Sequence, residues 1–160
     1  MTRPVAVFLV GTFGIACAAL FVRWALPAPP VVTAFWRIAL AVALLAGWLA
    51  LRGRSLRLPP GVLVPALAAG ACFGLDMALW NTALVETSVA DATFLVNTTP
   101  VWVGLHAVAV LREPPGSRFL AGAGLALAGT GLLLGDDLGR AASLRGDLLA
   151  LGAGAFYSAY

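Results

Sequence analysis

Three strongly polar side chains, Arg37, Asp76 and Asn97, fall inside long apolar runs of this sequence. A guanidinium, a carboxylate or an amide can bind a polar group of a ligand, and a carboxylate can also carry a proton. Each of the three is costly to bury without a partner. Arg37 and Asp76 lie in successive runs, so an ion pair between them is one expectation. Asp76 is a candidate proton carrier, and the alternative is a structural carboxylate bonded to a neighbouring helix.

The residues next to these three extend the candidate site. Trp80 follows Asp76 by one helical turn and shares its face, where it either lines the site or belongs to an interfacial aromatic belt. Pro100 follows Asn97 and Thr98 in the middle of a run, and it should kink a helix there because it lacks an N–H group. The kink either opens a binding site or only improves packing, and Asn97 either lines that site or bonds two helices together.

The composition of the chain points to lipid as its solvent. Of the 160 residues, 61% are hydrophobic and 11% are charged, whereas a soluble domain carries about 25% charged residues. The two cysteines lie in apolar runs, and the single histidine has no neighbouring ligands. We find no metal-ligand cluster, no cofactor motif, no set of nucleophile and base, and no basic stripe for nucleic acid. The sequence therefore disfavours an enzyme and a nucleic-acid-binding protein.

Helices must position the polar residues, because backbone groups in a bilayer have to bond within their own segment. Five runs of roughly 18–23 residues are long enough to span a membrane. They cover residues 5–26, 31–51, 61–83, 89–111 and 118–135. Prolines and arginines separate the runs. We predict an all-α, polytopic transmembrane helix bundle in contact with the lipid bilayer.

The arginines between the runs predict the orientation. With the N-terminus in the cytoplasm, six arginines fall in or beside inside segments and three on the outer side, which the positive-inside rule favours. In this orientation Arg37, Asp76 and Asn97 lie at roughly 9, 10 and 12 Å from the outer face. Three consecutive runs thus place polar groups at a similar depth, which predicts one polar layer. The alternative for Arg37 is a side chain that extends to the outer interface.

A sixth apolar run begins near Asp147, after a predicted loop at 136–145, and stops at Tyr160. Its roughly 14 residues reach only about 21 Å, which is too short to span a bilayer. We therefore expect residues 146–160 to be the start of a further, truncated unit and the sequence to be incomplete.

Taken in order, several pieces of the chain resemble the EamA domain of the drug/metabolite transporter superfamily. They are Phe35 to Ala39, Leu75 to Trp80, Thr87 to Pro100, Leu111 to Glu113 and Gly122 to Leu134. Gly146 to Ala150 and Phe156 to Tyr160 resemble the start of a second such repeat. The sequence departs from some relatives at Asn81, where they carry histidine.

The resemblance implies that residues 1–135 form the first five-helix repeat of an inverted-repeat, ten-helix transporter. It implies a secondary transporter or exporter of small metabolites in the cell membrane, with proton coupling as one option. The implied partners are a small-molecule substrate and a second repeat, in the same chain or in a partner chain. The pathway candidates are Arg37, Asp76, Trp80, Asn97, Thr98 and Pro100. The alternative is a non-transporting membrane subunit, a half-module that pairs with another chain.

Overall fold

The computed structural model describes residues 2–54, 59–135, 139 and 143–160. Within these ranges the chain is helical and contains no strand, which confirms the predicted all-α class. Most of the predicted loop at 136–145 lies outside the described residues. Four charged residues used for the orientation or its charge balance also lie outside them: Arg57, Asp136, Asp137 and Arg140.

The chain folds into α-helices and one π-helical turn. The helices are α1 (Thr2–Ala16), α2 (Ala18–Trp24), α3 (Pro30–Leu51), α4 (Leu63–Glu86), α5 (Val89–Val96), α6 (Thr99–His106), α7 (Ser117–Leu134) and α8 (Leu144–Tyr157), with the π-helical turn η1 at Ala107–Leu111. Among the residues that the structure describes, four segments are long and apolar enough to cross a membrane: Pro4–Trp24, Pro30–Leu51, Leu63–Glu86 and Val89–Leu111. The 18-residue helix α7 occupies the fifth predicted run.

Two of the predicted continuous helices are interrupted. The first run divides into α1 and α2 at Cys17, and the fourth divides into α5, α6 and η1. The third helix was expected to end at Ala83, and this boundary was wrong. The Thr87 N–H still donates to the Ala83 carbonyl at 2.9 Å, so α4 continues to Glu86. The helix ends there because Ser88 starts the next one, with its side chain accepting from the Asp91 N–H at 2.8 Å.

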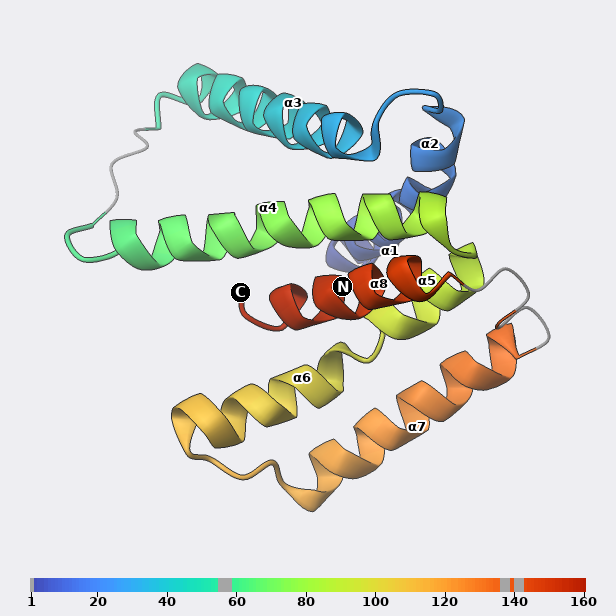
Figure 1. Ribbon diagram of the computed structural model, residues 1–160. Coiled ribbons are helices and arrows are strands. Elements are labelled where there is room, and N and C mark those ends of the chain that lie inside the picture. The colour runs from blue at the N-terminus through green and yellow to red at the C-terminus, as the bar shows by residue number, and fades with distance from the viewer. Residues whose placement is uncertain (1, 55–58, 136–138, 140–142) are drawn as a thin grey trace.

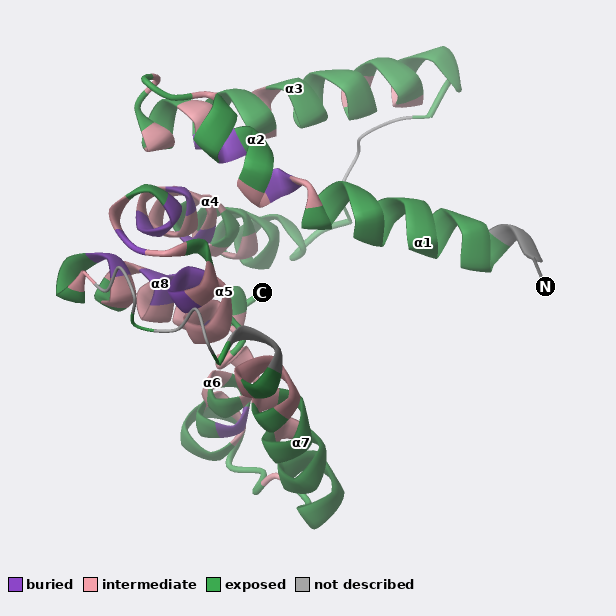
Figure 2. Cartoon of the chain, turned by 90° about the vertical axis from the view of Figure 1, so that its right-hand side faces the viewer, coloured by how far each residue is buried: buried purple, intermediate pink, exposed green. Residues whose placement is uncertain are grey.

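The helices α3, α4, α8, α6 and α7 follow one another across the molecule (Figure 1). Helix α8 lies between α4 and α5, although it comes last in the sequence. It begins beside the end of α4, where Thr87 donates to Asp147, and it ends beside the middle of α4, where Tyr160 contacts Asp76. Helix α8 therefore runs antiparallel to α4. Helix α1 projects away from the other helices (Figure 2).

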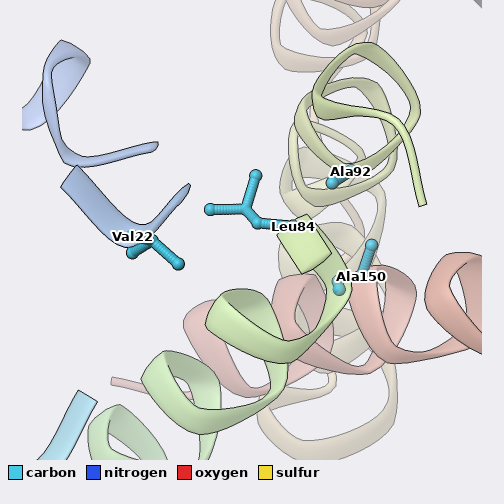
Figure 3. Close-up of a cluster of buried hydrophobic side chains, with 5 residues drawn as sticks. Val22, Leu84, Ala92 and Ala150 are labelled. Carbon is cyan, nitrogen blue, oxygen red and sulfur yellow. The ribbon is translucent and has the colours of Figure 1, made fainter. Parts of the chain in front are cut away.

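The buried core is small and lies where α2, α4, α5 and α8 meet. Leu84 is fully buried and lies between Val22 of α2 and the alanines Ala92 and Ala150 (Figure 3). Large apolar side chains on α1, α3 and α7 are exposed. Exposed apolar surface on this scale suits a surrounding of lipid or of further helices.

Arg23 caps the end of α4. Its Nε donates to the Leu84 carbonyl at 3.1 Å and its Nη2 to the Thr87 carbonyl at 3.0 Å. The last carbonyls of a helix lack partners within the helix and carry partial negative charge, so a guanidinium there is stabilising. This arginine thus joins α2 to α4.

Candidate functional site

Asp76 lies in the middle of α4 and is 2% exposed. The Tyr160 hydroxyl donates a hydrogen bond to Asp76 Oδ2 at 2.7 Å. Tyr160 reaches this carboxylate because α8 runs back along α4 from Thr87. The sequence analysis did not include Tyr160 among the candidates, since 84 residues separate the partners. The buried carboxylate therefore has a partner on the helix that packs beside it.

Arg37 faces Trp80, one turn beyond Asp76 on α4. The guanidinium carbon lies 6.0 Å from the centroid of the Trp80 ring, which is a cation–π contact. Arg37 is exposed, and its guanidinium lies beyond ion-pair distance from the Asp76 carboxylate. The expected ion pair between these two described residues is therefore not formed. The indole Nε1 of Trp80 is buried and has no hydrogen-bond partner within the described residues.

Arg37 also borders two open cavities with mostly apolar walls. The larger, of about 560 Å³, lies between α1, α2, α3 and α4, and the smaller, of about 370 Å³, lies along α3 beside Phe73. Asn81 of α4 contributes to the larger cavity. A cavity of several hundred Å³ with few polar groups is typical of small-molecule sites.

Asn81 is fully buried, and its amide is held in one orientation. Its Nδ2 donates to the Pro30 carbonyl and to Thr33 Oγ1, both at 3.3 Å. The Asn81 Oδ1 is buried and has no partner among the described residues. Sequence reasoning had noted Asn81 only as a departure from histidine in relatives, so it missed this acceptor.

Asn97 and Thr98 form the interruption between α5 and α6. Thr98 Oγ1 donates to the Leu95 carbonyl and Thr99 Oγ1 to the Val96 carbonyl, each at 2.6 Å. Pro100 stands in the first turn of α6, where its missing N–H costs little. The Leu95 carbonyl also accepts from the Thr98 N–H at 3.1 Å. The residue four positions after Val96 is Pro100, which has no N–H, so the Thr99 hydroxyl supplies a donor to the Val96 carbonyl.

The predicted polar layer is only partly assembled. Arg37 and Trp80 meet between α3 and α4, and Asp76 bonds to Tyr160 beside α8, whereas Asn97 is exposed and lines neither cavity. Thr98 and Pro100 lie at the α5–α6 interruption, and Thr99 Oγ1 lies 3.4 Å from the Gly154 carbonyl of α8. The described residues contain no group of three or more metal-ligating side chains.

A second contact between distant polar residues lies near the end of α8. Ser158 Oγ is 2.9 Å from His106 Nδ1, and it donates to the Ala155 carbonyl at 2.6 Å. Because its single hydrogen is used in that bond, Ser158 accepts from an imidazole Nδ1–H. His106 thus connects α6 to α8.

Comparison with known proteins gives one family and one curated relative. Residues 2–135 match the EamA-like transporter family. The chain is similar to a protein of Bacillus subtilis (strain 168) named "Uncharacterized transporter YwfM", with 34% identity over 93 residues. The match covers 58% of this chain and 31% of that protein, so it spans about a third of the length of the relative. No solved structure matches the chain.

Proposed function

The chain belongs to the EamA-like transporter family, and from that premise we propose that it works as a secondary transporter or exporter of small metabolites, coupled to protons through Asp76. The observation that carries this proposal is the buried carboxylate of Asp76 in the middle of α4, bonded to Tyr160. Ionisable groups at such positions in membrane helices are expensive and mark ion or substrate paths.

The surroundings of Asp76 support a path for a solute. Trp80 lies one turn beyond Asp76 and contacts Arg37, which borders two cavities of several hundred Å³. A carboxylate that exchanges a proton would change the charge next to Arg37, and that change would alter the affinity for a charged solute. Such a linkage is what coupling between a proton and a substrate requires.

We propose that the protein resides in the cell membrane with its N-terminus in the cytoplasm. The side on which α2 ends and α3 begins also carries the α4–α5 turn and the start of α8. Arg23 on that side is engaged with the carbonyls of α4. The sequence has six arginines in or beside inside segments and three on the outer side, with Arg23 among the three. This asymmetry favours the proposed orientation.

We propose further that residues 1–135 form the first repeat and that α8 starts a second one. Two features support additional helices around this bundle: the cavities are open, and α1, α3 and α7 carry exposed apolar faces. The same features support a second candidate function, a membrane subunit that pairs with another chain without transporting a solute itself. Crosslinking in native membranes separates the two, because a constant protein partner is expected only for the subunit.

The transport proposal is tested with the full-length protein in liposomes that contain a pH-sensitive dye. An imposed pH gradient and a panel of small metabolites should give solute-dependent proton flux. Asp76→Asn should reduce that flux to the background of empty liposomes, because an amide carries no titrating proton. Glu113→Gln, which changes an exposed carboxylate in the α6–α7 connection, is the matched control and should keep the flux. Flux at the unmodified rate in Asp76→Asn would refute proton coupling through this residue.

A further inference from the structure

We propose that the larger cavity binds a small organic anion with an apolar body and one hydrogen-bond donor, in which Arg37 holds the anionic group and Asn81 Oδ1 accepts from the donor. The inference rests on the proposed transport function, because it names the class of solute that this site would carry. Its evidence is the placement of Arg37 and Asn81 in a cavity whose other lining residues, apart from Thr33, are apolar or glycine.

Arg37 supplies the charge for the anion. Within the described part of the chain, no carboxylate lies at ion-pair distance from its guanidinium, and Asp76 is engaged by Tyr160. The contact with Trp80 uses the face of the indole ring and leaves the N–H donors of the guanidinium available. A planar guanidinium binds a carboxylate through two parallel hydrogen bonds, and apolar walls strengthen that attraction.

Asn81 supplies a specific acceptor. The Pro30 carbonyl can only accept, so the NH2 group of Asn81 must face it, and Thr33 Oγ1 already donates to the same carbonyl at 2.7 Å. The amide is therefore fixed with Oδ1 on its other side, buried and without a partner within the described residues. A buried acceptor without a donor costs about 1–3 kcal/mol. Because Oδ1 has almost no accessible surface in this structure, a solute hydroxyl or amide N–H would remove that cost once a shift of the cavity wall exposes this atom.

The remaining walls of the cavity define the body of the solute. Ile15, Phe21, Val22 and Leu40 contribute apolar surface. The volume of about 560 Å³ suits a molecule of modest size. A charged end, one donor and a branched hydrocarbon body together match the chemistry of these walls.

Equilibrium binding to the full-length protein in phosphatidylcholine nanodiscs tests the proposal with three probes. They are 2-hydroxy-4-methylpentanoate, its deoxy analogue 4-methylpentanoate, and the neutral 4-methylpentane-1,2-diol. We expect the hydroxy acid to bind most tightly and the deoxy acid about tenfold more weakly, because it leaves Asn81 unpaired. The diol should not bind measurably. Equal binding of the three probes to the unmodified protein would overturn the proposal without any variant.

Two variants assign the two roles. Arg37→Gln should weaken both acids by about thirtyfold, as expected for a lost charge-assisted pair. Asn81→Leu should bring the hydroxy acid to the affinity of the deoxy acid. Arg52→Gln is the matched control. Arg52 directly follows α3, its guanidinium lies 5.2 Å from the centroid of the Trp48 ring, and it lines neither cavity. An equal loss in Arg52→Gln would refute a specific site at Arg37.

The source of the anion is tested separately. Nanodiscs that contain phosphatidylglycerol should leave the affinity for the hydroxy acid unchanged. If phosphatidylglycerol abolishes binding of the hydroxy acid, the site binds a lipid headgroup, and the proposal of a solute site is overturned. Because binding is measured without a gradient, it is independent of transport. Proton flux with other metabolites but no binding of these acids would refute this site alone. Binding without any flux would refute the transport proposal alone.

Discussion

The two sides of α4 are built in different ways. On one side α8 approaches so closely that a Cβ added at Gly146 would lie 2.8 Å from Thr87 Cβ and 2.9 Å from the Thr87 backbone nitrogen. Ala150 and Ala153 on the same helix are fully buried. Small residues of this kind let helix backbones meet, as membrane helices commonly do. Polar contacts at both ends of α8 add to this packing.

On the other side of α4, the helices α1, α2 and α3 leave room. Both cavities lie there, and Arg37 borders each of them. Gly11 and Gly14 of α1 have no atom within 4 Å of an added Cβ. Small residues occur here as they do on α8, but Gly11 and Gly14 border the larger cavity and do not contact another helix closely.

Helix α4 therefore separates a closed interface from an open one. The closed side holds the Asp76 carboxylate through Tyr160, and the larger cavity on the open side is bordered by Arg37 and Asn81.

Gly146→Leu should have the largest effect, because the new leucine side chain would overlap with Thr87 at the end of α4. Overpacking of this kind costs about 1–3 kcal/mol or more, and here it should separate α8 from α4. The free energy of unfolding of the full-length protein in detergent measures the loss. Gly70→Leu on α4 is the control, since nothing lies within 4 Å of its Cβ position. Equal losses in both variants would contradict a closed interface at α8.

Tyr160→Phe should have an intermediate effect. It removes the donor to Asp76 Oδ2 and leaves a buried carboxylate oxygen without that partner, at a cost of about 1–3 kcal/mol in unfolding free energy. Tyr157→Phe is the control, because the Tyr157 ring contacts Tyr160 but is half exposed, and no hydrogen bond of its hydroxyl is found among the described residues. If the two variants are equally stable, the Tyr160–Asp76 bond does not hold α8 in place.

The helices of the open side were the easier part to predict from the sequence. The predicted run 31–51 differs by one residue from α3, because Pro30 starts that helix and arginines and a glycine follow it. The interruption at Cys17 was not predicted, since no proline or charge marks it. The interruption near Pro100 was expected as a kink, but it falls at Asn97 and Thr98, because the proline itself is accommodated in the first turn of α6.

Contacts around the candidate site could be predicted only where the residues lie on neighbouring helices. Asp76 and Trp80 are one turn apart, and Arg37 is on the adjacent helix, so periodicity brought them together. Tyr160 and Asn81 were missed because their roles depend on distant pairing, which a single sequence does not encode. One signal was present: Gly146, Ala150 and Gly154 recur every four residues and form a small-residue face on α8. That face predicts close contact with another helix.

Ser158→Ala should have the smallest effect of the three, about 0.5–1.5 kcal/mol, because it removes one side-chain hydrogen bond between α6 and α8. Thr130→Ala is the control, since the Thr130 hydroxyl bonds to the Ala126 carbonyl of its own helix. Ser158 accepts from the Nδ1–H of His106, because its own hydrogen is used in the bond to the Ala155 carbonyl. Thermal or chemical unfolding of both variants in detergent measures the loss. Equal losses in Ser158→Ala and Thr130→Ala would mean that the contact between Ser158 and His106 adds nothing to the packing of α8, and that the closed side of α4 is held by Thr87, Asp76 and the small residues alone.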